Sequence, residues 1–165
     1  YWAVGSGDSH RVRSAPIGYP RTYLQLGYDD PKLASGSDVR DAVKQGRSTV
    51  GAGLYMTVEG PNGSGPGDTV PRGDGTVDIV VTTQAPSWVA ADALEIIVDG
   101  ETIATEPLMP MGPGPAQVFV NLVTLTLPDK PRSWVVFHAR GMGDLAPVQP
   151  GKASFAASNP IFFIK

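Results

Sequence analysis

The sequence predicts a mainly β protein whose larger part is an immunoglobulin-like antiparallel β-sandwich. Six segments rich in β-branched and aromatic residues follow Gly46, and each is bounded by Gly, Pro or Asp. The 165 residues include 20 Gly and 16 Pro, more turn formers than a helical protein tolerates. Short strands with such punctuation favour a sandwich over a sheet with crossover helices.

The first elements expected along the chain are a strand-like start at residues 1–4 and a single helix. Ser37 is a suitable N-cap, and Asp38 and Asp41 favour the positive end of the helix dipole. Gly46 supplies the C-terminal stop. The helix is too short to be stable alone, so we expect it to dock by an apolar stripe. This stripe consists of Val39, Ala42 and Val43.

The β part begins after this helix. The six expected strands cover residues 54–59, 77–83, 94–98, 117–127, 133–139 and 161–164. The Asp99-Gly100 dipeptide predicts a tight hairpin between the third of these and residues 102–104. In the segment 133–139 both alternating faces are largely apolar, which indicates a central strand. We expect Trp134 to lie buried between the two sheets.

Asp8 and His10 are the candidate metal ligands. Residues two apart on a strand point to the same face, so a carboxylate and an imidazole at the end of the 1–4 segment form a two-point claw for zinc, manganese or iron. The alternative is a turn aspartate beside a surface histidine. His138, the other histidine, is expected to be a hydrogen-bonded structural residue rather than a ligand.

Four motifs resemble the C-terminal part of a PHP-type metal-dependent hydrolase, in the branch of carbamate-hydrolase-like proteins. They are Gly-Ser-Gly-Asp-Ser-His at residues 5–10, Ile-Gly-Tyr-Pro-Arg-Thr-Tyr-Leu at 17–24, Ala-Val-Lys-Gln-Gly-Arg at 42–47 and Ser-Asn-Pro-Ile-Phe at 158–162. Two departures are Gly7, where serine is usual, and Val-Gly-Ala-Gly at 50–53, which replaces a Thr-x-Gly-Pro-like stretch. Neither removes a ligand.

The resemblance implies two domains. Residues 1–47 would be the last strand and helix of a truncated α/β barrel that carries the final metal-ligand segment, and residues 48–165 would be a β-sandwich accessory domain. The early His-x-His pair of such barrels is missing, so the metal centre would be completed by the rest of the PHP-like barrel, in a longer parent enzyme. Arg21 would then bind an anionic group of a small-molecule substrate. The chain alone is expected to be catalytically silent and to hold metal poorly.

Charge and composition exclude several partners. Residues 1–50 carry seven Lys and Arg against five acids, whereas residues 51–165 carry six against eleven, and the net charge is −3. An acidic remainder argues against nucleic acid. No apolar run approaches the ~20 residues that span a bilayer. Arg11 and Arg13 are expected to be solvated loop residues. The absence of cysteine excludes disulfides and thiolate metal sites and leaves the compartment open.

Two function classes follow from the sequence. In the first, the chain is the C-terminal fragment of a metal-dependent hydrolase that cleaves a phosphoester, an amide or a carbamate, and Asp8 and His10 hold part of its di- or trinuclear centre. In the second, it is a non-catalytic β-sandwich module that binds carbohydrate or protein or has a structural role. The two classes predict different behaviour: metal binding that depends on Asp8 and His10, or ligand binding by residues 48–165.

Overall fold

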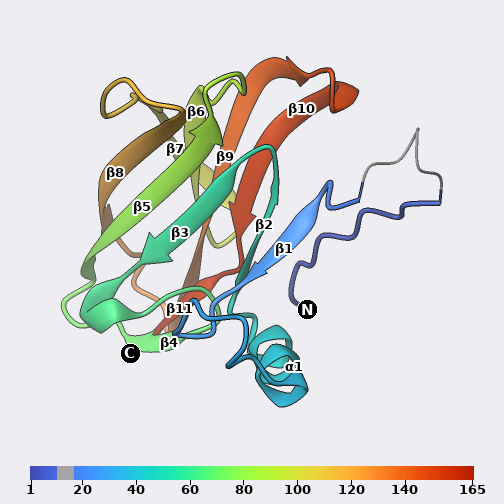
Figure 1. The fold of residues 1–165 in the computed structure, drawn as a ribbon. Helices are drawn as coiled ribbons and strands as arrows, with labels where there is room; N and C mark the ends of the chain where they lie inside the picture. Colours follow the sequence, from blue (N-terminus) through green and yellow to red (C-terminus); the bar gives the residue numbers. More distant parts are fainter. Residues whose placement is uncertain (11–16) are drawn as a thin grey trace.

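A computed structural model describes residues 1–10 and 17–165 of the chain, and Arg11 and Arg13 therefore lie outside the described residues. The fold is mainly β, with two sheets that share one hydrophobic core (Figure 1). Almost all strand pairs are antiparallel, and the pair β4 and β11 is parallel. The β-sandwich expected from the sequence is therefore confirmed at the level of a mainly β, antiparallel architecture.

The larger sheet has eight strands and is organised around β9 (Arg132–Leu145). One edge of β9 pairs with β6 (Ala93–Val98), which in turn pairs with β7 (Glu101–Pro107). Along the other edge β10 (Gln149–Ser158) and β11 (Ile161–Ile164) follow one another. Beyond them the sheet is completed by β2 (Ser48–Ala52) on β10, β1 (Arg21–Leu24) on β2, and β4 (Thr69–Pro71) on β11.

The smaller sheet contains β3 (Tyr55–Glu59), β5 (Thr76–Pro86) and β8 (Ala116–Thr126) in that order. A short 3-10 turn, η1 (Pro61–Gly63), follows β3. The chain crosses from the larger to the smaller sheet at Gly53 and Leu54, between β2 and β3. Gly53 has a φ of +78°, and a Cβ there would lie 2.6 Å from Cδ2 of Leu145. This close approach explains why the crossing requires glycine.

The core lies between the two sheets and is built from alternating positions of the strands. In β9 the inward residues are Val135, Phe137 and Ala139, all fully buried. The largest buried side chains outside β9 are aromatic or long aliphatic: Phe119, Phe163, Leu54, Met56, Ile79, Leu94, Ile96 and Ile161. β9 is central, as the sequence predicted, because it pairs along both edges.

The expected burial of Trp134 between the sheets is wrong. Trp134 shares a face with His138, and this face of β9 points away from the core, so Trp134 is only half-buried. Its backbone amide donates to Oδ1 of Asp99 at 3.0 Å. The alternation of residues along β9 was predicted correctly. The face that points to the smaller sheet is the one with Val135 and Phe137, and not the one with Trp134.

The helix α1 (Gly36–Gln45) begins two residues earlier than expected, because Ser35 rather than Ser37 is its N-cap. Ser35 accepts from the Asp38 amide, and the Asp38 carboxylate accepts from the Ser35 amide, which forms a capping box. Gly46 ends the helix in the left-handed conformation, as predicted. Of the expected docking stripe only Ala42 is buried; Val39 and Val43 remain 41% and 37% exposed. No described helix is long and apolar enough to cross a membrane.

Candidate functional site

The N-terminal segment is an arm held against the sandwich rather than the expected strand at residues 1–4. The indole of Trp2 donates to the Lys44 carbonyl at 2.8 Å and meets the ring of Phe162 edge to face. Ala3 exchanges two hydrogen bonds with the buried Asn159 side chain. These contacts replace a strand ladder, which explains why an apolar start does not form a strand here.

The arm then runs alongside β1. The Gly5 amide donates to the Thr22 hydroxyl at 2.8 Å, and this hydroxyl donates back to the Gly5 carbonyl at 3.2 Å. A Cβ on Gly7 would lie 3.3 Å from the amide nitrogen of Gly18. The segment that carries Asp8 and His10 is therefore packed beside the segment that leads into Arg21.

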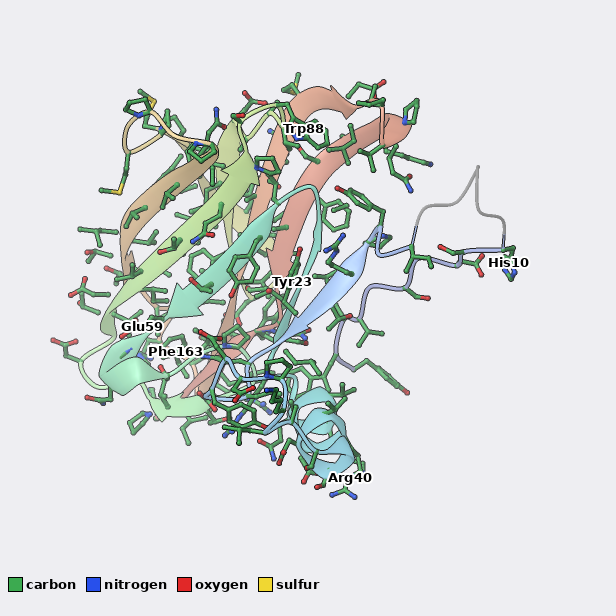
Figure 2. All side chains as sticks on the ribbon, in the orientation of Figure 1. His10, Tyr23, Arg40, Glu59, Trp88 and Phe163 are labelled. Atoms are coloured by element: carbon green, nitrogen blue, oxygen red, sulfur yellow. The ribbon has the colours of Figure 1, made fainter. Side chains whose placement is uncertain are left out.

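Asp8 and His10 converge, as the sequence predicted, although they do not follow a strand. Oδ1 of Asp8 lies 2.7 Å from Nε2 of His10, and the two side chains are 86% and 80% exposed. Asp8 has a φ of +42°, in the region that aspartate tolerates better than most residues. Figure 2 shows His10 at the outer end of the arm, away from both sheets.

This pair can offer two ligands to a divalent cation. In a tetrahedral zinc site with bonds of about 2.0 Å the two ligand atoms would stand roughly 3.3 Å apart. Opening the pair from 2.7 Å to that separation needs only a small rotation of two exposed side chains. Within residues 1–10 and 17–165 no group of three or more His, Cys, Asp or Glu side chains is placed to hold a metal.

Arg21 does not point to a cavity shared with Asp8 and His10, since neither of these two lines any of the cavities described below. Its Nε donates to the Gly18 carbonyl at 2.8 Å, and its guanidinium lies 5.4 Å from the centre of the Tyr19 ring. A Cβ on Gly18 would lie 3.1 Å from a terminal nitrogen of Arg21. Gly18, which also packs on Gly7, thus separates the Arg21 guanidinium from the arm.

Two cavities open where β1 of the larger sheet faces β3 of the smaller one. Their volumes are about 280 and 380 Å³, and both are lined by Tyr23 and Tyr55. The two rings meet edge to face, with centroids 4.8 Å apart. Figure 2 shows Tyr23 between the ribbons of β1 and β3. We call the two cavities together the tyrosine cleft.

The two halves of the tyrosine cleft differ in charge. The smaller half includes Tyr28 and Asp29, whereas the larger half includes Tyr19, Arg21 and Gln84 and no acidic residue. Burial raises the pKa of the Tyr23 hydroxyl, and the positive charge of Arg21 opposes this rise. Tyr23 is therefore a neutral hydrogen-bond donor at physiological pH.

His138 is a hydrogen-bonded structural residue, as expected. Its Nδ1 lies 2.9 Å from Oε2 of Glu95, while Nε of Arg140 donates to Oε1 of the same carboxylate at 2.9 Å. The hydrogen bonds from His138 and Arg140 lower the pKa of Glu95. This network lies across β6 and β9 and includes none of the residues of the arm or the tyrosine cleft.

The sequence reasoning missed Tyr19, Tyr23, Tyr55 and Asn159. A usable signal was present for two of them, because Tyr19, Arg21 and Tyr23 stand two residues apart and so share a face in extended backbone. Tyr55 lies in β3 and Asn159 between β10 and β11, both distant in the chain from residues 1–24, and only the pairing of the strands identifies them.

A scan against protein-family models finds no model that matches this chain. Searches of curated proteins and of solved structures likewise find no significant match. The function is therefore inferred from the residues and contacts described above.

Proposed function

We propose that this chain supplies the last metal-ligand segment of a PHP-type metal-dependent hydrolase, with Asp8 and His10 as its two ligands. The observation that carries the proposal is the convergence of Oδ1 of Asp8 and Nε2 of His10 to 2.7 Å on an exposed arm. An exposed contact of this kind contributes little to stability, so little stability is lost when the two side chains bind a metal instead of each other. Carboxylate oxygen and imidazole nitrogen are ligands that zinc, manganese and iron accept.

The remaining ligands would come from the rest of a PHP-like α/β barrel, of which residues 1–47 would form the end. A durable hydrolase site takes at least three protein ligands with further hydrogen-bonded support. The exposure of both side chains leaves room for a facing domain to add them. β1 also pairs with β2, so the proposed barrel segment and the sandwich at residues 48–165 would be joined through one sheet.

When bound, the metal would supply a water of lowered pKa and would polarise the phosphoester, amide or carbamate group of a substrate. The chain's own residues would hold the metal through Asp8 and His10. Arg21 would bind an anionic group of the substrate, because it is an arginine without a carboxylate partner among the described residues.

The test compares metal content and hydrolysis in the longest natural polypeptide that contains residues 1–165. Asp8→Ala and His10→Ala should each lower the bound zinc or manganese and reduce hydrolysis of a phosphoester or carbamate probe by about 10²-fold or more. The matched controls are Asp41→Ala, on the exposed face of α1, and His138→Ala, in the Glu95 network. Loss of metal in the controls but not in the two ligand variants would contradict the proposal.

A second candidate, a ligand-binding sandwich module, is favoured by the tyrosine cleft. Half-buried tyrosines around a cavity of several hundred cubic ångströms are typical of small-molecule sites. The two candidates are distinguished by metal, since a binding module keeps its ligand affinity after Asp8→Ala and His10→Ala.

A further inference from the structure

The larger half of the tyrosine cleft combines one cation with aromatic walls. Tyr19 lies in the segment just before β1, Arg21 and Tyr23 lie in β1, Tyr55 in β3 and Gln84 in β5. Tyr55 and Gln84 face one another in the pairing of β3 with β5. Because these residues belong to both sheets, the folded sandwich holds the walls of the cavity in place without a ligand.

Arg21 is already oriented in this cavity. Its Nε is fixed by the Gly18 carbonyl at 2.8 Å, and its planar head lies over the Tyr19 ring. Among the described residues no carboxylate forms an ion pair with it, unlike Arg40, Arg47, Arg72 and Arg140. An arginine held in this way loses little further freedom when it binds a carboxylate through its terminal nitrogens.

The other residues that line this cavity favour an anionic ligand with an apolar body. Among the described residues no acidic side chain lines this half of the cleft, so the one formal charge that a ligand would meet there is the positive charge of Arg21. The tyrosine rings and the apolar surface of Leu54, Ala85 and Pro86 suit a flat, apolar ligand body. The Tyr23 hydroxyl, whose pKa is raised further above neutral by burial, can donate a hydrogen bond to the same ligand.

We propose that this cavity binds a small organic acid with a flat apolar body. Its carboxylate would accept hydrogen bonds from the terminal nitrogens of Arg21, and its body would pack against Tyr23 and Tyr55. If the cavity is a substrate subsite, this proposal rests on the proposed hydrolase function. Binding of the organic acid itself is independent of that function, because no contact in the cavity involves Asp8, His10 or a metal.

The experiment titrates the metal-free chain of residues 1–165 with benzoate and follows the amide resonances of β1, β3 and β5 in ¹H–¹⁵N spectra. Benzamide, which has the same shape and no charge, is the matched ligand. Benzoate should bind at least about tenfold more tightly than benzamide. The perturbed amides should be those around the larger cavity.

Three variants test the role assigned to the charge. Arg21→Gln should weaken benzoate binding by about tenfold or more and leave benzamide unchanged. Gln84→Glu should also weaken benzoate, because it adds a negative charge at an exposed strand position without removing Arg21. Arg40→Gln, which breaks an exposed ion pair on α1, should have no effect.

Equal binding of benzoate and benzamide, or unchanged benzoate affinity in both Arg21→Gln and Gln84→Glu, would overturn the proposal. Spectra of each variant without ligand report whether its fold is retained, so a loss of binding through unfolding is recognised. If benzoate binds as proposed while Asp8→Ala leaves metal content and hydrolysis unchanged in the longer polypeptide, the cleft stands and the hydrolase function fails.

Discussion

Replacing Asn159 by alanine should release the N-terminal arm and destabilise the sandwich. The Asn159 side chain is 2% exposed, and its Oδ1 accepts from the Ala3 amide at 2.8 Å. Its Nδ2 donates to the Ala3 carbonyl at 3.2 Å and to the Ser48 hydroxyl at 2.8 Å. Asn159→Ala removes all three hydrogen bonds and leaves the backbone bond from the Asn159 amide to the Ser48 carbonyl.

The expected loss of stability differs between the two partners of Asn159, Ala3 and Ser48. Ala3 is exposed, so water can replace its lost partners, and each bond there contributes about 0.5–1.5 kcal/mol. Ser48 is 3% exposed, and leaving its hydroxyl without this partner costs about 1–3 kcal/mol. The two bonds to Ala3 and the bond to Ser48 together lower the expected free energy of unfolding by about 2–6 kcal/mol.

Urea unfolding at neutral pH measures this change, read from the transition midpoint at constant slope. Asn121→Ala is the matched control, because the Asn121 amide donates to Glu106 at 2.8 Å in a more exposed place. The control should lose no more than about 1 kcal/mol. An Asn159→Ala variant as stable as this control would refute the assignment of Asn159 as the anchor of the arm.

Two further perturbations follow from packing and charge. Gly141→Ala should destabilise the fold by about 1–3 kcal/mol or more in thermal unfolding, because its Cβ would collide with the backbone between β5 and β6. The control Gly36→Ala, in open space at the start of α1, should change stability by less than about 0.5 kcal/mol. Equal effects of the two substitutions would contradict this packing. Glu95→Gln should lower stability near neutral pH. The hydrogen bonds from His138 and Arg140 lower the pKa of Glu95 from its ordinary 4.5, so their stabilisation is present above that value and is lost as the pH falls through the lowered pKa. The difference in unfolding free energy between Glu95→Gln and the wild type should shrink below about pH 4.5, and a constant difference would show that ionisation of Glu95 contributes nothing.

The long, regular strands could be predicted from the sequence because their pattern is strong. All six expected strands are present, as β3, β5, β6, β8, β9 and β11, and Asp99 and Gly100 form the expected hairpin turn with positive φ values. β1, β2, β4 and β10 were not predicted. β1 and β4 have only four and three residues, and β2 and β10 are rich in Ser, Ala and Gly. Their residues are small because they pack closely against neighbouring strands, and a Cβ on Gly51 would collide with the Leu54 carbonyl.

The site was predictable only in part. The spacing of Asp8 and His10 correctly indicated that their side chains converge, because the two residues are close in the chain. The anchor at Asn159 and the contact between Tyr23 and Tyr55 depend on strand pairing over long sequence separations, which periodicity cannot provide. Arg21 was expected to point toward the same cavity as Asp8 and His10. This expectation was wrong, since Arg21 points toward Gly18 and the tyrosine cleft.

Adding Mn²⁺ to residues 1–165 and following the paramagnetic broadening of the amide resonances tests whether Asp8 and His10 form one part of a metal centre. Two ligands bind weakly, but even brief binding broadens nearby amides. We predict selective broadening of residues 7–10 and of Gly18, which packs on Gly7, and loss of this selectivity in His10→Ala. Broadening centred on other exposed acids, such as Asp129 and Asp144, with no preference for the arm, would contradict the claim.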